Sequence, residues 1–88
     1  RQYGGETFHL QISKELRSIT DCLNYIHQNY SEPLTVDKLS AYLNVSRSTF
    51  IRHFTQICGC SPHQYILDYR LKKAKEFLEI LLFSLPMQ

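Results

Sequence analysis

Residues 35–54 read TVDKLSAYLNVSRSTFIRHF, and no other segment of the chain is as informative about its structure. Its apolar residues recur at the spacing of two short amphipathic helices. The first is expected to begin at Thr35, whose hydroxyl can cap it, and to end at Leu43, because Asn44 tolerates the left-handed conformation that closes helices. Ser46 can cap the second helix. Two short helices joined by such a tight turn are typical of a helix-turn-helix.

The two helices, residues 35–43 and 46–58, are each expected to bury one side. At about 100° per residue, the inward positions are Val36, Leu39, Ala41 and Leu43 in the first helix and Phe50, Phe54 and Ile57 in the second. The opposite side of the second helix holds Ser48, Arg52, Thr55 and Gln56, with Arg47 and Ile51 on its flanks. A cation, hydroxyls and an amide are groups that contact phosphates and base edges. The spacing fits groove binding and an ordinary solvated helix equally well.

The charge is unevenly distributed, although its net value is only +2. Residues 1–46 sum to −1 and residues 76–88 to −2, whereas six cations and one anion give residues 47–75 a net charge of +5. The cations are Arg47, Arg52, Arg70, Lys72, Lys73 and Lys75. Such a concentration is the electrostatic footprint expected of a nucleic-acid-binding surface. The three lysines also fit a solvated helix face.

Two longer helices are predicted to flank this pair. Apolar residues from Ile12 to Tyr30 step by four and three, which predicts a helix over residues 12–30. A last helix over residues 62–83 begins with a capping-box pattern at Ser61 and Gln64 and a proline at its first position. Its expected inward stripe is Tyr65, Leu67, Leu71, Ala74, Leu78 and Leu81. The fold class is therefore all-α, a small helical bundle over residues 11–83, with a linker or disordered end at 1–10 and a tail at 84–88.

About two thirds of the chain, from Ile19 to Leu78, resembles the first half of the DNA-binding domain of AraC/XylS-type bacterial transcription regulators. The matching positions are Tyr25, Ile26, Leu34, Thr35, Val36, Leu39, Leu43, Ser46, Phe50, Arg52, Phe54, Gly59, Ser61, Pro62, Tyr65, Arg70, Leu71 and Ala74. The resemblance implies a homeodomain-like, AraC-type half domain whose helix 46–58 enters the major groove of double-stranded DNA.

The resemblance also implies which residues touch DNA. It places base contacts at Ser48, Ile51 and Arg52, and phosphate contacts near Ser46 and Arg47. The polar face adds Thr55 and Gln56 as phosphate contacts. Arg52 is expected to be the main base reader, because its planar fork can pair with guanine O6 and N7.

The chain departs from the family pattern after Leu78. The family domain has two helix-turn-helix units joined by a long helix, and nothing resembling the second unit follows here. We expect a fragment or a truncated relative, and Arg1 in place of an initiator Met favours a fragment or a cleavage product. The far end of the last helix is then expected to expose apolar surface and to mediate self-association. The residues concerned are Phe77, Leu81, Leu82, Phe83 and Leu85.

Metal binding and catalysis find little support. His53, Cys58, Cys60 and His63 lie within eleven residues, and zinc takes such ligands, but Cys-x-Cys lacks the turn of the usual structural sites. The acidic residues are spread over helix surfaces without a converging base, so no catalytic residue, metal or cofactor is expected. There is no signal peptide and no apolar run near 18 residues, so no membrane association is expected.

Two functions remain open. The first is sequence-specific DNA binding as part of a bacterial transcription regulator, in the cytoplasm and associated with the nucleoid. The second is a helical dimerisation or protein-interaction module that reads no DNA. Steep salt dependence of binding to duplex DNA would favour the first.

Overall fold

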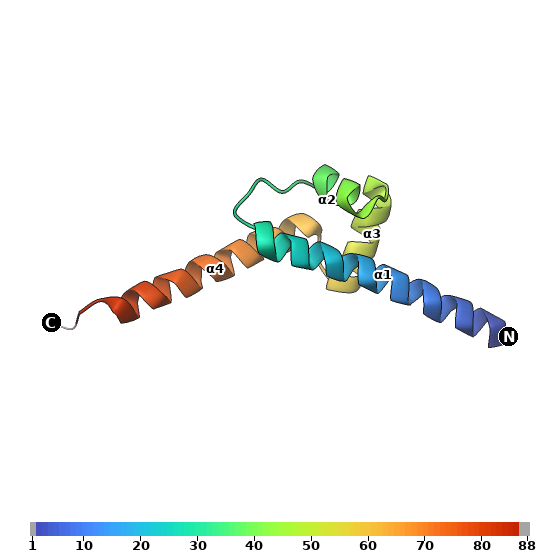
Figure 1. Cartoon of the computed structure of the whole chain (residues 1–88), viewed down its shortest axis with the longest axis horizontal. Helices are drawn as coiled ribbons and strands as arrows, with labels where there is room; N and C mark the ends of the chain where they lie inside the picture. The colour runs from blue at the N-terminus through green and yellow to red at the C-terminus, as the bar shows by residue number, and fades with distance from the viewer. Residues whose placement is uncertain (1, 87–88) are drawn as a thin grey trace.

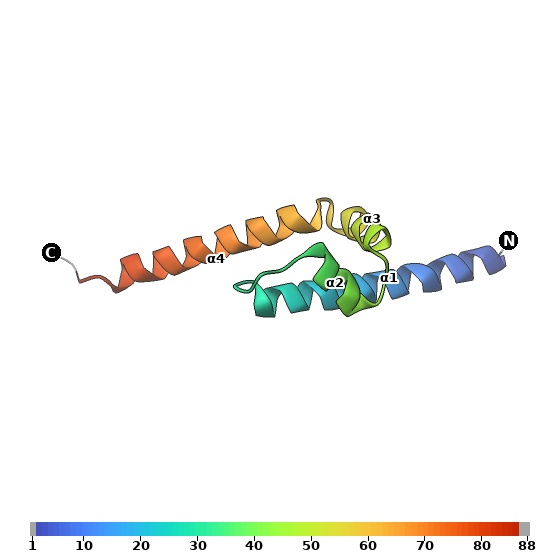
Figure 2. The ribbon, with the colours of Figure 1, turned by 90° about the horizontal axis from the view of Figure 1, so that it is seen from above.

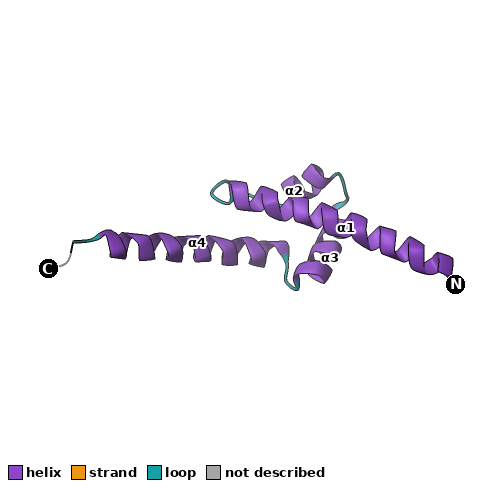
Figure 3. Ribbon diagram, turned by 60° about the horizontal axis from the view of Figure 1, so that its bottom comes forward, coloured by secondary structure: helices purple, strands orange, loops and turns teal. Residues whose placement is uncertain are grey.

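Four helices make up the protein in the computed structural model, which describes residues 2–86 and the side chains of residues 13–86. They are α1 (Gln2–Asn29), α2 (Val36–Leu43), α3 (Arg47–Cys58) and α4 (Pro62–Ser84) (Figure 1). Figure 3 shows that short loops join the helices and that the described residues contain no strand. The predicted all-α fold, with α2 and α3 as its helix-turn-helix, is confirmed.

The start of α1 differs from the prediction. The helix begins at Gln2, where a linker was predicted over residues 1–10. Gly4 and Gly5 suggested the linker, because each glycine costs a helix about 1 kcal/mol relative to alanine. The segment contains no proline, however, so nothing interrupts the backbone hydrogen bonds of the helix. At the other end α4 stops at Ser84, and the predicted tail reaches residues 87 and 88, which lie outside the described part.

The chain is elongated because its two long helices project from a small body. The N-terminal part of α1 and the C-terminal part of α4 point in opposite directions (Figures 1 and 2). The Cα radius of gyration is 17.6 Å, against about 12 Å for a compact domain of this length. The body therefore consists of the second half of α1, α2, α3 and the first turns of α4.

A core contributed by all four helices holds this body together. Its buried members are Ile19, Cys22, Ile26, Leu39, Phe50, Phe54 and Ile66. The Phe54 ring meets the rings of Phe50 and Tyr65 edge to face, each at a centroid distance of 5.7 Å. Burial, helped by the nearby Cys58, raises the pKa of the Cys22 thiol to about 12, so Cys22 packs as a small neutral group. The inner face of α3 is thus fixed by its two phenylalanines.

Several positions expected to face inward are exposed instead. In α2, Ser40 is buried in place of Ala41, and its hydroxyl donates to the Asp37 carbonyl at 3.2 Å. Ile66, and not Leu67, enters the core from α4. The other exposed positions are Leu16, Ile57, Leu71, Ala74, Leu78 and Leu81, and the side chain of Ile12 lies outside the described set. Periodicity shows which residues share a face, but not how far the neighbouring helices extend along it.

The predicted caps are confirmed. The hydroxyls of Thr35, Ser46 and Ser61 each accept a hydrogen bond from the backbone N–H three residues ahead, at 3.1, 3.2 and 3.1 Å. Asn44 and Gly59 adopt the left-handed conformation, with φ of 60° and 80°. These local signals set the ends of α2 and α3, and with them the angle at which α3 leaves the turn.

An aromatic cluster joins α1 to α4. The His27 ring stacks on Tyr69 at a centroid distance of 4.4 Å, and its Nε2 lies 2.7 Å from the Tyr65 hydroxyl. Tyr30 meets Tyr69 edge to face at 5.4 Å. This cluster sits where α4 leaves the body, so it fixes the direction in which α4 projects.

Stability should therefore fall below neutral pH. Burial and the nearby Lys72 and Lys73 lower the pKa of His27 below its ordinary 6.5. Near that pH the unfolded chain binds more protons than the folded one, so the His27 contribution is complete above pH 6.5 and declines as the pH falls toward the lower folded-state pKa. Urea unfolding between pH 7.5 and 5.5 should show this decline. His27→Gln should flatten it; equal slopes in the wild-type and His27→Gln proteins would contradict the assignment.

Candidate nucleic-acid interface

The outer face of α3 gathers the predicted contact residues. With Phe50 and Phe54 buried, the opposite side of the helix faces solvent. The structure exposes all seven predicted positions along α3 and its cap, namely Ser46, Arg47, Ser48, Ile51, Arg52, Thr55 and Gln56. Ile51 keeps 36% of its surface accessible and so offers an apolar contact amid polar neighbours. Their contacts with DNA remain a prediction.

The turn between α2 and α3 is held by backbone hydrogen bonds. The Asn44 N–H donates to the Ala41 carbonyl at 3.1 Å, and the Val45 N–H donates to the Ser40 carbonyl at 3.0 Å. These bonds close α2 and fix the course of the turn that leads into α3, while the buried Leu39 packs in the shared core. A helix presented to DNA needs such a support, because its contacts depend on a fixed register and orientation.

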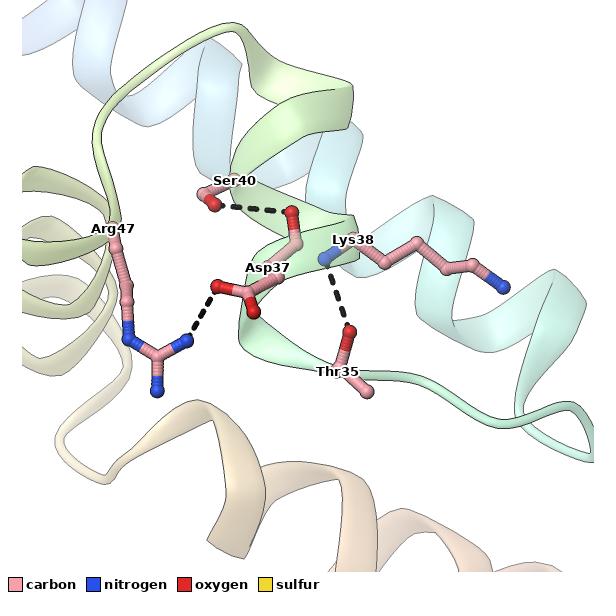
Figure 4. Close-up of polar contacts among 5 residues, drawn as sticks. All are labelled: Thr35, Asp37, Lys38, Ser40 and Arg47. Atoms are coloured by element: carbon pink, nitrogen blue, oxygen red, sulfur yellow. Dashed lines mark hydrogen bonds and ion pairs between the residues drawn. The ribbon is translucent and has the colours of Figure 1, made fainter.

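The N-terminal end of α3 is less available to DNA than the sequence suggested. The Ser46 hydroxyl accepts from the Thr49 N–H and donates to the Thr49 hydroxyl at 2.8 Å. Arg47 Nη1 donates to Asp37 Oδ1 at 2.5 Å (Figure 4). Asp37 was not among the predicted contact residues, because no sequence pattern pairs residues ten positions apart on different helices. The partner of Arg47 was therefore missed.

Arg52 differs from the two other arginines between residues 47 and 70. Arg70 lies in α4, where its Nε donates to the Tyr30 carbonyl at 2.7 Å and its Nη2 to the Glu32 carbonyl at 2.8 Å. Arg70, which the sequence counted in the basic footprint, therefore also holds the loop after α1 against α4. Among the described side chains, none forms an ion pair with Arg52. Its guanidinium is thus exposed and available.

The histidine and cysteine residues considered as zinc ligands do not form a metal site in the structure. His53 Nε2 is 3.4 Å from Glu15 Oε2, a contact that links α3 to α1. Burial and the neighbouring Cys60 raise the pKa of the Cys58 thiol. Within the described residues, no group of three or more potential ligands is placed to hold a metal ion. Nor does any helix in that part of the chain combine the length and hydropathy of a membrane span.

A comparison with protein families matches the region that contains the candidate interface. Residues 26–67 match the model of "Bacterial regulatory helix-turn-helix proteins, AraC family". The matched segment runs from the buried Ile26 in α1 to Leu67 in α4 and contains all of α2 and α3. It therefore covers most of the core and the whole candidate interface.

Individual relatives carry names of the same kind. The HTH-type transcriptional regulator GbdR of Pseudomonas aeruginosa strain UCBPP-PA14 is 41% identical over 51 residues, which cover 58% of this chain and 14% of the relative. The lactose operon transcription activator of Staphylococcus xylosus is 28% identical over 71 residues, 81% of this chain and 25% of the relative. The regulator ArgR of P. aeruginosa is 32% identical over 79 residues, 85% of this chain and 24% of the relative. No solved structure matches. This chain thus spans a quarter or less of the length of these three relatives.

Proposed function

Through residues 26–67 this chain belongs to the AraC family of bacterial regulatory helix-turn-helix proteins, and we propose that it binds duplex DNA sequence-specifically as part of a transcription regulator. The proposal rests on the exposure of the polar outer face of α3. Buried phenylalanines hold this helix to the body, while Arg52 projects from its other side without an ion-pair partner among the described residues. The proposal needs no catalytic residue and no cofactor, and it places the chain with the DNA of the nucleoid in the cytoplasm.

The dimensions of α3 suit the major groove. A helix of 12 residues is about 18 Å long, and the groove, about 12 Å wide, admits a helix. In this position Arg52 pairs with guanine O6 and N7. Ser48 can make one hydrogen bond to a base edge, and Ile51 can contact a thymine methyl group. Ser46 and Arg47 lie at the start of α3 and Thr55 and Gln56 in its last turn, so they are nearer the phosphates at the edges of the groove.

The experiment that tests the function is selection from a pool of random duplexes at about 50 mM salt. The wild-type chain should enrich a common motif that contains a guanine, and its affinity should fall with a log–log salt slope of about −0.9 for each phosphate that a cation neutralises. Enrichment is more informative than a single gel shift. Non-specific binding with dissociation constants of about 10⁻⁴ to 10⁻⁶ M is common, and a shift alone does not distinguish it from specific binding. Failure to enrich any motif, with no salt-dependent binding, would favour the alternative of a protein-interaction module.

The far half of α4 supports self-association as a second part of the proposal. Its apolar side chains are exposed, up to 90% for Phe83 and 68% for Leu82. The other members of this apolar segment are Phe77, Leu81 and Leu85. Exposed apolar surface of this kind marks interaction sites, and pairing two chains would supply two copies of α3 to one duplex.

Sedimentation at high micromolar concentration tests this second part. The wild-type chain should form a species heavier than a monomer, and Leu82→Ser combined with Phe83→Ser should return it to a monomer because it removes apolar contact area. Glu79→Gln, an exposed polar position in the same segment, should leave the mass unchanged. A strictly monomeric wild-type chain would contradict self-association without touching the proposal for α3.

A further inference from the structure

One ion pair connects the two helices of the helix-turn-helix on their solvent side. Asp37 lies in the first turn of α2 and Arg47 in the first turn of α3, and Figure 4 shows the guanidinium reaching across to the carboxylate. The side chains are 78% and 61% exposed. An exposed pair of this kind contributes little to stability. Because the pair lies beside the proposed DNA interface, it can instead affect how Arg47 binds phosphate.

The carboxylate and a DNA phosphate compete for the same guanidinium. Arg47 is a predicted phosphate contact, and in the free protein its Nη1 already donates a hydrogen bond to Asp37 Oδ1. A phosphate bound by Arg47 would also lie close to the carboxylate, which repels it. Because Asp37 neutralises Arg47, the net charge at the N-terminal end of α3 is zero and not +1.

We propose that Asp37 is a positioning residue that restrains Arg47 and so lowers the affinity of the chain for duplex DNA of every sequence. This inference rests on the proposed function of α3. Because phosphates carry no sequence information, Asp37 affects how tightly the chain binds and not which bases it prefers. Arg52, which lies in the next turn of α3 and is not paired with Asp37, keeps the base reading. Arg47 thus contributes to the affinity for DNA of any sequence, and Arg52 to the preference for particular bases.

The test is fluorescence anisotropy with labelled duplexes of about 20 base pairs, one of arbitrary sequence and one selected from the random pool. Asp37→Asn should tighten binding to both by a similar factor, about three- to tenfold at low salt, and steepen the salt slope by about 0.9, the value for one further neutralised phosphate. Arg47→Ala should weaken binding to both. In the Arg47→Ala background, Asp37→Asn should give a smaller gain than in the wild-type chain, because only the repulsion by the carboxylate is left to relieve.

Glu79→Gln is the matched control. It changes the total charge by the same amount at an exposed position in the projecting half of α4 (Figure 1), so it should leave both affinities unchanged. An equal gain from Glu79→Gln, or the same gain from Asp37→Asn with and without Arg47, would overturn the inference. Circular dichroism of each variant checks that the total helix content is unchanged.

The two hypotheses fail in different ways. If the wild-type chain binds and enriches a motif but Asp37→Asn changes nothing, the inference about Asp37 is wrong and the function of α3 stands. If neither the wild-type chain nor any variant binds duplex DNA at low salt, both are wrong.

Discussion

Phe54→Ala should lower the free energy of unfolding by about 3–5 kcal/mol, the usual cost of removing a buried phenylalanine. Phe54 is 0% exposed and contacts the rings of Phe50 and Tyr65, so its removal leaves a cavity where α3 and α4 meet. A small domain is stable by only about 5–15 kcal/mol, so this single change should remove much of the stability. Urea unfolding followed by far-ultraviolet circular dichroism measures it.

Ile51→Ala on the same helix provides the control. Ile51 lies on the outer face and is 36% exposed, so its truncation should change the free energy of unfolding by less than about 1 kcal/mol. If Phe54→Ala proves as mild as Ile51→Ala, the orientation of α3 described here is wrong. The same result would remove the support for every contact assigned to its outer face.

Arg52→Ala should weaken binding to the selected duplex by about 1–3 kcal/mol, which is roughly five- to 150-fold. It should also relax the preference at one base position, because a bidentate contact with one guanine is lost. Stability should be unaffected, since Arg52 is exposed and makes no ion pair within the described residues. Anisotropy titrations and a repeated selection with the variant measure the two effects.

Arg47→Ala separates base reading from phosphate contact. It should weaken binding to selected and arbitrary duplexes by the same factor and leave the enriched motif unchanged. If Arg52→Ala behaves in this uniform way and Arg47→Ala alters the motif, the roles of the two arginines are reversed.

Much of the fold could be predicted because it depends on local signals. The caps at Thr35, Ser46 and Ser61 and the left-handed closure at Asn44 each act within four residues, and the structure has them where the sequence predicted them. The burial of Leu39, Phe50 and Phe54 follows from helical periodicity. The α2–α3 unit was therefore the most predictable part of the chain.

What could not be predicted depends on packing between distant elements. The hydrogen bonds of Arg70 to carbonyl groups about forty residues away in the sequence had no signal in the pattern of charges. The stripe of α4 was expected to be buried as far as Leu81, although the helix leaves the body after its first turns. For the candidate site, exposure of the α3 residues was predictable, whereas the pairing of Arg47 with Asp37 was not, since it depends on how α2 and α3 are oriented.

The most direct test of the claim that α3 reads the major groove replaces the guanine of the selected motif with 7-deazaguanine. This base lacks the N7 acceptor and leaves Watson–Crick pairing intact, so only a major-groove contact is lost. The wild-type chain should bind the modified duplex about tenfold more weakly, while Arg52→Ala should bind both duplexes equally, because the hydrogen bond is already absent. If the wild-type chain binds the two duplexes equally at every guanine of the motif, α3 does not read guanine in the major groove.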